Sequence, residues 1–193
     1  MTDPLALLTH DRTAAHESGD PWANLCVLTT IADDDAPEAR VLVLRDIDGA
    51  LGVFVNATSP KARELDNSRE ATVLTYLASI GVQYRLRARL EPMPAHIVRD
   101  SWHLRPAIPK VMDWVYATRA PQSSRVASRD ALMTLFDEVG DDLPDPPVAP
   151  EQAQGLYIVP TRIDRLQLAG DRVHERHLYR HTPHGWERQV LIP

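Results

Sequence analysis

Apolar and polar residues alternate along much of the first half of the chain. The clearest run is VQYRLRARLEP, residues 82–92, in which every second residue from Val82 to Leu90 is apolar. An alternation with a period of two places one set of side chains on each face of a β-strand. Similar runs rich in β-branched residues are separated by turn sequences such as DDDAPE and DIDG. We predict strands over residues 25–32, 38–47, 51–57, 71–78 and 82–92.

The pattern changes to a helical one in the middle of the chain. Apolar residues from Leu132 to Val139 follow at helical spacing after Ser128, a residue type that favours the helix N-cap. Asp3 followed by Pro4 indicates another helix near the start. The predicted helices cover residues 4–17, 94–104, 109–119 and 128–139. Residues 141–154 are predicted to be loop. Strands are predicted again over residues 155–169, 173–181 and 186–193.

These elements predict a mostly β fold with peripheral helices, in which an antiparallel sheet closes into a barrel. The chain has 193 residues, which is a usual size for one domain with its own hydrophobic core. No linker or internal repeat divides the sequence. We therefore expect one domain over residues 1–193.

Composition and charge exclude several functions. The formal net charge of -6 argues against nucleic acid as a partner, because binding to the phosphate backbone requires a strongly basic surface. Cys26 is the single cysteine, so neither an intramolecular disulfide nor a cysteine metal cluster is expected. The opening MTDPLALLTHDR has an early acid and no long apolar run. We expect no signal peptide, no membrane association and a cytoplasmic location.

The sequence DRVHERHLYR, residues 171–180, sets cationic side chains at every second position. In a strand, Arg172, His174 and Arg176 would project from one face and form a site for an anion. The alternative is a solvated edge strand, where charges discourage pairing with another chain.

A second candidate for anion binding is NATSPKARELDN, residues 56–67. Ser59 suits the N-cap and Pro60 the first helical position, so the backbone N–H groups of Lys61 and Ala62 would be free at the start of a helix. With the Lys61 charge nearby, a phosphate group would bind there. An ordinary capped surface helix is the alternative.

Two further strands carry candidate cations. Arg40 and Arg45 are five residues apart, which places them on opposite faces of a regular strand unless a bulge intervenes. Arg87 and Arg89 fit the exposed face of a half-buried strand, whereas the role of Gln83 on the same strand stays open.

The late histidines do not predict a metal site. His174, His177, His181 and His184 have spacings that would suit one face of a helix. The local pattern, however, is that of a strand, and Pro183 would interrupt a helix. The chain also lacks G-x-S-x-G and glycine-rich nucleotide-binding sequences.

Five short segments follow one another along the chain: RVLVLR at residues 40–45, SPKA at 59–62, VQY at 82–84, QSSR at 122–125 and RVHERHLY at 172–179. In this order and spacing they resemble the pyridoxine/pyridoxamine 5'-phosphate oxidase family of FMN-binding split barrels. The similarity extends from about residue 22 to the end of the chain.

The resemblance implies a cofactor and a set of site residues. FMN would be held by Arg40, Val41, Arg45, Val55, Asn56, Lys61, Gln83, Gln122, Ser123 and Arg176. Arg45, Arg105, Arg172 and His174 would contact the substrate, with Arg172 and His174 as the catalytic residues. It also implies a homodimer with the flavin at the subunit interface. Residues 155–193 resemble the family's C-terminal dimerisation region. The implied reaction is oxidation of a vitamin B6 phosphate to pyridoxal 5'-phosphate with dioxygen as acceptor.

Several positions depart from the family's pattern. Ser101 and Pro109 stand where the family has a tyrosine and a serine that contact the substrate phosphate, on either side of Arg105. Arg45 replaces a lysine, and Leu166 replaces a tryptophan beside the flavin. Loss of two hydroxyl contacts would cost about 3 to 6 kcal/mol of substrate binding. FMN binding is therefore expected more strongly than activity on a B6 phosphate.

Two alternatives to B6 phosphate oxidation stay open. The first keeps FMN and changes the substrate to another ring compound, such as a phenazine precursor, a reading that Ser101 and Pro109 favour. The second is a flavin-binding module without turnover. Retention of both Arg172 and His174 argues against it, because binding of flavin alone does not require them.

Overall fold

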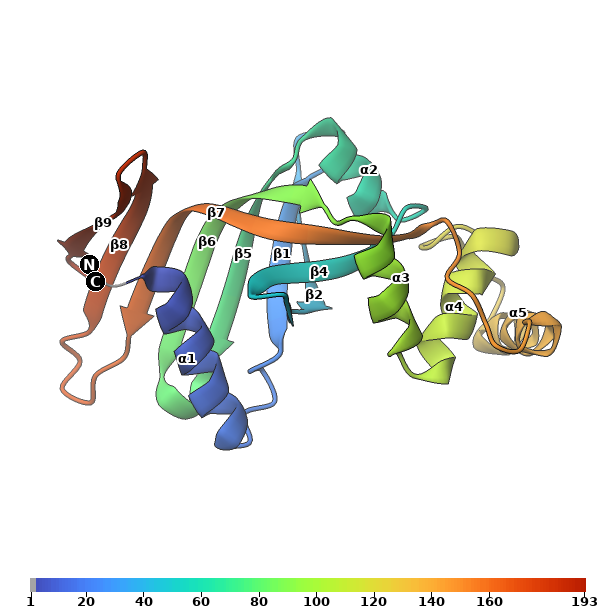
Figure 1. The fold of residues 1–193 in the computed structure, drawn as a ribbon, viewed down its shortest axis with the longest axis horizontal. Helices are drawn as coiled ribbons and strands as arrows, with labels where there is room; N and C mark the ends of the chain where they lie inside the picture. Colours follow the sequence, from blue (N-terminus) through green and yellow to red (C-terminus); the bar gives the residue numbers. More distant parts are fainter. Residues whose placement is uncertain (1–2) are drawn as a thin grey trace.

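The computed structural model describes residues 3–193 and arranges nine strands in one antiparallel sheet (Figure 1). The predicted fold class is confirmed. The strands are β1 (Leu25–Ile31), β2 (Pro37–Val43), β3 (Arg45–Ile47), β4 (Ala50–Asn56), β5 (Glu70–Leu77), β6 (Val82–Pro92), β7 (Ala153–Gln167), β8 (Glu175–Thr182) and β9 (Gly185–Leu191). The helices are α1 (Pro4–Glu17), α2 (Pro60–Asn67), η1 (Ala78–Ile80), α3 (Ala95–His103), α4 (Ala107–Thr118) and α5 (Arg129–Asp142).

The longest strand, β7, determines how the sheet is divided. The strand order is β2-β1-β5-β6-β7-β4-β3, and β8 also pairs with β7 before continuing into β9. One edge of β7 pairs with β6, whereas its other edge pairs first with β4, at Gln154↔Val55, and later with β8, at Leu166↔Arg176. The sheet therefore separates beyond β7 into a barrel part and a C-terminal hairpin (Figure 1).

The inner face of the sheet forms the hydrophobic core. On β6, the alternating residues from Tyr84 to Leu90 are buried, as the period-two pattern predicts, while Arg87 and Arg89 are exposed on the other face. Cys26 is fully buried in the same core, and burial raises the pKa of its thiol to about 11. A small apolar core role for this cysteine follows.

The strand predicted over residues 38–47 is interrupted at Leu44. Arg12 of α1 is buried and donates hydrogen bonds to the carbonyl oxygens of Ala23 at 3.0 Å and Leu44 at 3.2 Å. It also pairs with Asp46 at 2.7 Å. Arg12 thus occupies the Leu44 carbonyl oxygen, which does not pair with a neighbouring strand. Strand β2 therefore ends at Val43, and β3 begins at Arg45.

A buried polar cluster joins α1 to the sheet. The Tyr84 hydroxyl donates to Asp11 Oδ2 at 2.6 Å, and Arg165 Nη2 donates to the same oxygen at 3.0 Å. Burial and the Asp11 carboxylate both raise the pKa of Tyr84, which keeps the phenol protonated as a donor. The cluster ties together three elements that are far apart in the sequence, namely α1, β6 and β7.

Several other predicted boundaries differ from the observed ones; strand β7, for example, covers Ala153–Gln167 instead of residues 155–169 and so begins inside the predicted loop. Helix α4 begins at Ala107, two residues earlier than predicted, and α5 continues to Asp142 into the predicted loop. Strand β8 begins only at Glu175, so the predicted start at residue 173 is wrong. The turn predicted at residues 182–185 joins β8 to β9, with Gly185 at a positive φ of 105°.

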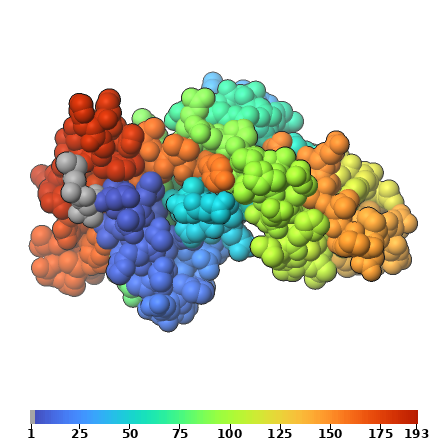
Figure 2. Space-filling view, viewed as in Figure 1, coloured from blue at the N-terminus to red at the C-terminus, as the bar shows by residue number. Residues whose placement is uncertain are grey.

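The elements are distributed along an elongated molecule (Figure 2). The C-terminal hairpin, red in Figure 2, lies at one end, and helices α4 and α5, yellow to orange, lie at the other. Helix α1 and strand β4 cover the middle of this view. The helices α3 to α5 therefore extend from the barrel on the side where β4 ends and α2 begins.

Candidate functional site

A cleft of about 320 Å³ lies where the end of β4 and the start of α2 meet helix α4. Five predicted site residues line it: Val55, Asn56, Lys61, Arg105 and Gln122. The other lining residues are Leu42, Phe54, Ile108, Pro109, Met112, Asp113 and Tyr116. The structure thus brings together residues that lie up to 67 positions apart between Val55 and Gln122.

The start of α2 supplies one wall of the cleft. Ser59 caps the helix as predicted, and its Oγ accepts a hydrogen bond from the Ala62 N–H at 3.3 Å. The prediction that the Ala62 N–H is free was therefore wrong, because the cap itself uses this donor. Lys61 directs its Nζ to Gln122 Oε1 at 3.1 Å, which connects α2 to the loop after α4.

Lys61 lies in a partly buried, positively charged environment. Burial lowers its pKa most, the nearby Arg40 lowers it further, and Glu64 opposes both effects. Arg40 pairs with Glu64 Oε2 at 3.0 Å and also contacts the Thr30 hydroxyl. An anion placed beside Lys61 would relieve the repulsion between the two cations, which makes this end of the cleft suited to a negatively charged group.

Asn56 presents an unpaired donor at the same end. Its Oδ1 accepts hydrogen bonds from the Thr58 N–H at 3.0 Å and the Thr58 hydroxyl at 2.7 Å. Its Nδ2 is buried and makes no hydrogen bond of normal geometry within residues 3–193, although it lies near enough to Asp113 to help lower the pKa of that carboxyl. A buried amide donor without a partner is costly and indicates a place for an acceptor.

The opposite wall contains an ion pair that the sequence analysis did not identify. Arg105 Nη1 contacts Asp113 Oδ2, which also accepts a hydrogen bond from Trp102 Nε1 at 2.8 Å. Asp113 is buried, and burial raises its pKa while Arg105 and Trp102 act in the opposite direction. The available signal was a single acid in the otherwise apolar VMDWVY of α4.

Gln83 and Arg176 belong to a different surface. Gln83 lies opposite Leu166 across β6 and β7, and Leu166 lies opposite Arg176 across β7 and β8, so the three side chains share one face. Arg176 makes two hydrogen bonds to Asp164, at 3.0 and 2.8 Å, and Arg85 contacts Asp164 at 2.7 Å. Hydrogen bonding by Arg176 is the main cause of the lowered pKa of Asp164.

Arg172 and His174 do not lie on a strand, so the predicted row of cations on one strand face is wrong. Both residues precede β8 in the connection from β7, where Arg172 is exposed and has a positive φ of 69°. The His174 Nδ1 accepts a hydrogen bond from the Ala169 N–H at 3.1 Å. In the neutral ring, the proton is therefore on Nε2, which leaves Nε2–H as a donor.

Four other predicted residues lie outside the cleft lining; one is Arg40, which pairs with Glu64 as described above. Ser123 follows Gln122 directly, is exposed and has a positive φ of 73°, a strained conformation for a residue other than glycine. Val41 is 49% exposed on the face of β2 opposite to Arg40 and Leu42. Arg45 is exposed at the start of β3.

A single chain keeps the two groups of predicted residues apart. Val55 of the cleft pairs with Gln154, whereas Arg176 pairs with Leu166, twelve residues further along β7. At about 3.3 Å per residue, that separation corresponds to roughly 40 Å along the strand. One chain therefore presents two partial sites, one at the cleft and one on the outer face of β6, β7 and β8.

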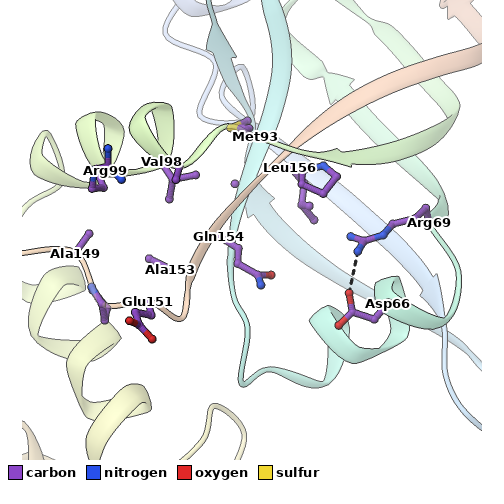
Figure 3. A pocket seen from close by; sticks show the side chains of 14 residues that line it. Asp66, Arg69, Met93, Val98, Arg99, Ala149, Glu151, Ala153, Gln154 and Leu156 are labelled. Atoms are coloured by element: carbon purple, nitrogen blue, oxygen red, sulfur yellow. Dashed lines mark hydrogen bonds and ion pairs between the residues drawn. The ribbon is translucent and has the colours of Figure 1, made fainter.

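A second cavity, of about 430 Å³, lies against the start of β7, at residues 153–156, and the start of α3. Figure 3 shows Val98 and Arg99 of α3 on one side of it and the Asp66–Arg69 ion pair, with an N–O distance of 3.0 Å, on the other. Met93 packs closely at its inner end, where a Cβ on Gly155 would lie 2.5 Å from the Met93 sulfur. None of the site residues predicted from the sequence lines this cavity.

Residues 3–193 carry neither a metal-binding cluster nor a membrane-spanning helix. This part of the chain contains no group of three or more histidine, cysteine, aspartate or glutamate side chains placed to hold a metal ion. None of its helices has the length and apolar character needed to cross a membrane.

Solved structures with the same fold include FMN-binding proteins. The chain superposes on PhzG from Burkholderia lata 383, crystallised with tetrahydrophenazine-1-carboxylic acid, with a TM-score of 0.88 and 22% identity over 100% of this chain and 94% of PhzG. A pyridoxamine 5'-phosphate oxidase-related, FMN-binding protein from Nostoc punctiforme gives a TM-score of 0.75 and 19% identity over 98% of this chain and 96% of that protein. The fold is that of the split barrels.

Curated relatives define the family more narrowly. The pyridoxine/pyridoxamine 5'-phosphate oxidase of Pseudomonas putida is 30% identical over 89% of this chain and 79% of its own length. The enzyme of the same name from Myxococcus xanthus is 31% identical over 88% of this chain and 82% of its own length. No family model matches the sequence. On the strength of these relatives, the chain belongs to the pyridoxine/pyridoxamine 5'-phosphate oxidase family.

Proposed function

We propose that the protein is an FMN-dependent oxidoreductase that oxidises a small ring compound. The observation that carries this proposal is the polar part of the cleft lining, where Lys61 at the start of α2 and the unpaired Nδ2 of Asn56 at the end of β4 both line the cleft. Both are donors suited to a phosphate or to a ring carbonyl, which are acceptor groups of FMN. Membership of the family supports the same cofactor.

The residues of the cleft would divide the binding of FMN between them. Lys61 and the neighbouring Arg40 would balance the charge of the phosphate, and Gln122 would hold the Lys61 side chain in place through their 3.1 Å hydrogen bond. Apolar contacts from Phe54 and Val55 would exclude water. Bound FMN would supply the redox chemistry by accepting a hydride from the substrate, with dioxygen as the expected acceptor.

A homodimer would complete the site. One chain holds Lys61 and Gln122 in the cleft near the β4 pairing of β7, whereas Gln83 and Arg176 lie beside Leu166, roughly 40 Å further along that strand. A second copy is therefore needed to bring both groups to one flavin. We propose that Gln83, Arg176 and the Nε2–H of His174 reach the flavin and the substrate from the partner subunit.

The outer face of β1, β2 and β5 offers a surface for this second copy. Ile31, Val41, Val43 and Tyr76 are between 37% and 49% exposed. Their strand registers place all four on one face, which we call the apolar patch. Tyr76 also pairs with Gln83, so the apolar patch continues into the surface that carries Gln83 and Arg176.

The cofactor assignment predicts that the purified protein is yellow and that heat releases FMN rather than FAD. A terminal monophosphate suits the cations at the start of α2, whereas FAD carries a further nucleotide that the 320 Å³ cleft would have to accommodate. Chromatography of the released chromophore distinguishes the two. Colourless protein that also fails to take up added FMN would refute the proposed function.

The dimer predicts that Val43→Asp yields a monomer that binds FMN poorly. A charge within the apolar patch would be desolvated on association, and the flavin would lose its contacts from the second chain. Light scattering with a flavin titration measures both effects. Val148→Asp, in an exposed loop outside the patch, is the matched control. A monomeric wild type with full flavin occupancy would contradict the shared site.

A further inference from the structure

The wall of the cleft formed by α3 and α4 differs in charge from the wall formed by α2. On the α2 side, Lys61 is present in addition to the Arg40–Glu64 ion pair, so this side keeps a net positive charge. On the α4 side, Arg105 is the cation that lines the cleft, and Asp113 lies directly against it. The pair is neutral as a unit, and its neighbours Ile108 and Met112 are apolar.

The Arg105–Asp113 pair is held in place from behind. Trp102 is 1% exposed, and its indole N–H donates to the Asp113 oxygen that Arg105 also contacts. The Asp113 side chain is 8% exposed, compared with 29% for Arg105. Because both donors converge on one buried oxygen, the carboxylate cannot turn away from Arg105 without leaving the Trp102 N–H unpaired.

A phosphate group brought to Arg105 would meet the Asp113 charge. The repulsion between these like charges would offset much of the attraction that Arg105 exerts on the phosphate. Ser101 and Pro109, on either side of Arg105 in the sequence, offer one short hydroxyl between them. The wall therefore lacks the surplus of positive charge and donors that a dianion requires.

We propose that Asp113 is a specificity-determining residue that directs the site to ring substrates without a phosphate group. Such a substrate would pack its ring against Ile108, Met112 and Tyr116 and place a hydrogen-bonding group near the neutral pair. This inference rests on the proposed function, because it assigns the substrate class of the same cleft.

The test compares pyridoxine 5'-phosphate with pyridoxine, which differ only in the phosphate group, by titration calorimetry on FMN-loaded protein. The wild type is expected to bind the phosphate ester no more than about threefold more tightly than pyridoxine. Asp113→Asn keeps the acceptor for Trp102 and removes the charge, so binding of the ester is expected to tighten by about tenfold or more, equivalent to about 1.4 kcal/mol. Pyridoxine binding is expected to change less than threefold.

Asp142→Asn is the matched control, because it removes the same charge from an exposed pair with Arg119. It is expected to leave the ratio of the two affinities unchanged. If Asp113 had a purely structural role, its replacement would change the affinities for both ligands equally. The proposal is overturned if the wild type prefers the phosphate ester by a hundredfold, or if Asp113→Asn produces no selective gain. A failure to bind FMN would refute the proposed function alone, since the ratio can also be measured on FMN-free protein.

Discussion

Replacement of Lys61 by Glu is expected to weaken FMN binding by about 100-fold or more. The substitution removes a charge-assisted hydrogen bond, worth about 1.5 to 3 kcal/mol, and adds a charge that repels the phosphate. A loss of about 2.8 kcal/mol corresponds to 100-fold in the dissociation constant. Quenching of flavin fluorescence on titration with the protein measures the effect.

The lowered pKa of Lys61 predicts how the affinity for FMN depends on pH. In the free protein, burial and Arg40 lower the pKa of Lys61, whereas a bound phosphate would raise it. FMN affinity should therefore fall as the pH rises through the lowered pKa, on the acid side of the ordinary lysine range. Lys61→Gln should abolish that dependence.

Arg129→Glu reverses a charge at the exposed start of α5 and is the control for Lys61→Glu. It should leave FMN affinity within about twofold of the wild type, because an exposed charge outside the cleft is screened by salt. If Lys61→Glu binds FMN as the wild type does, the phosphate lies elsewhere.

Replacement of Asp11 by Ala is expected to lower the free energy of unfolding by about 3 to 5 kcal/mol. The carboxylate is buried between the Tyr84 hydroxyl at 2.6 Å and Arg165 at 3.0 Å. Its removal would leave the buried Tyr84 phenol without an acceptor and would take the carboxylate partner from the partly buried Arg165, which keeps only its neutral acceptors, Gln167 Oε1 and the Tyr84 hydroxyl. Urea unfolding at one fixed protein concentration measures the change, because dimerisation would make the apparent stability depend on concentration.

Asp33→Ala is the surface control for Asp11→Ala. Asp33 and Arg63 are 3.7 Å apart, and both side chains are more than 60% exposed. The loss should be below about 1 kcal/mol, as is usual for exposed ion pairs. Equal effects of the two substitutions would show that the Asp11 cluster does not stabilise the fold as proposed.

The local pattern of the sequence was sufficient to predict the elements that form this sheet. The alternation along β6 identified both its buried and its exposed face, because period-two side-chain placement is a property of the strand itself. Ser59 likewise predicted the start of α2, since capping depends on neighbouring residues. The interruption at Leu44 was not predictable in this way, because Arg12 causes it from 32 residues away.

The sequence predicted only part of the candidate site, again because some of its features depend on contacts between distant residues. The order of short motifs identified Lys61 and Gln122, and the fold brings them to one cleft. The alternation around His174, however, suggested a strand that begins only at Glu175, because tertiary pairing with β7 decides where β8 starts.

Residue identities and their local spacing were enough to indicate the family, most of the secondary structure and which side chains were candidates for the site. The tertiary structure alone decided how these side chains are grouped. Asp113 shows the difference most clearly: in the sequence it is one acid in an apolar helix, whereas in the fold it meets Trp102 and Arg105. Its two partners lie 11 and 8 positions earlier in the sequence, and only the packing of the chain brings them to its carboxylate. The interaction energy of such charges depends on their separation in space, which the local sequence pattern does not give.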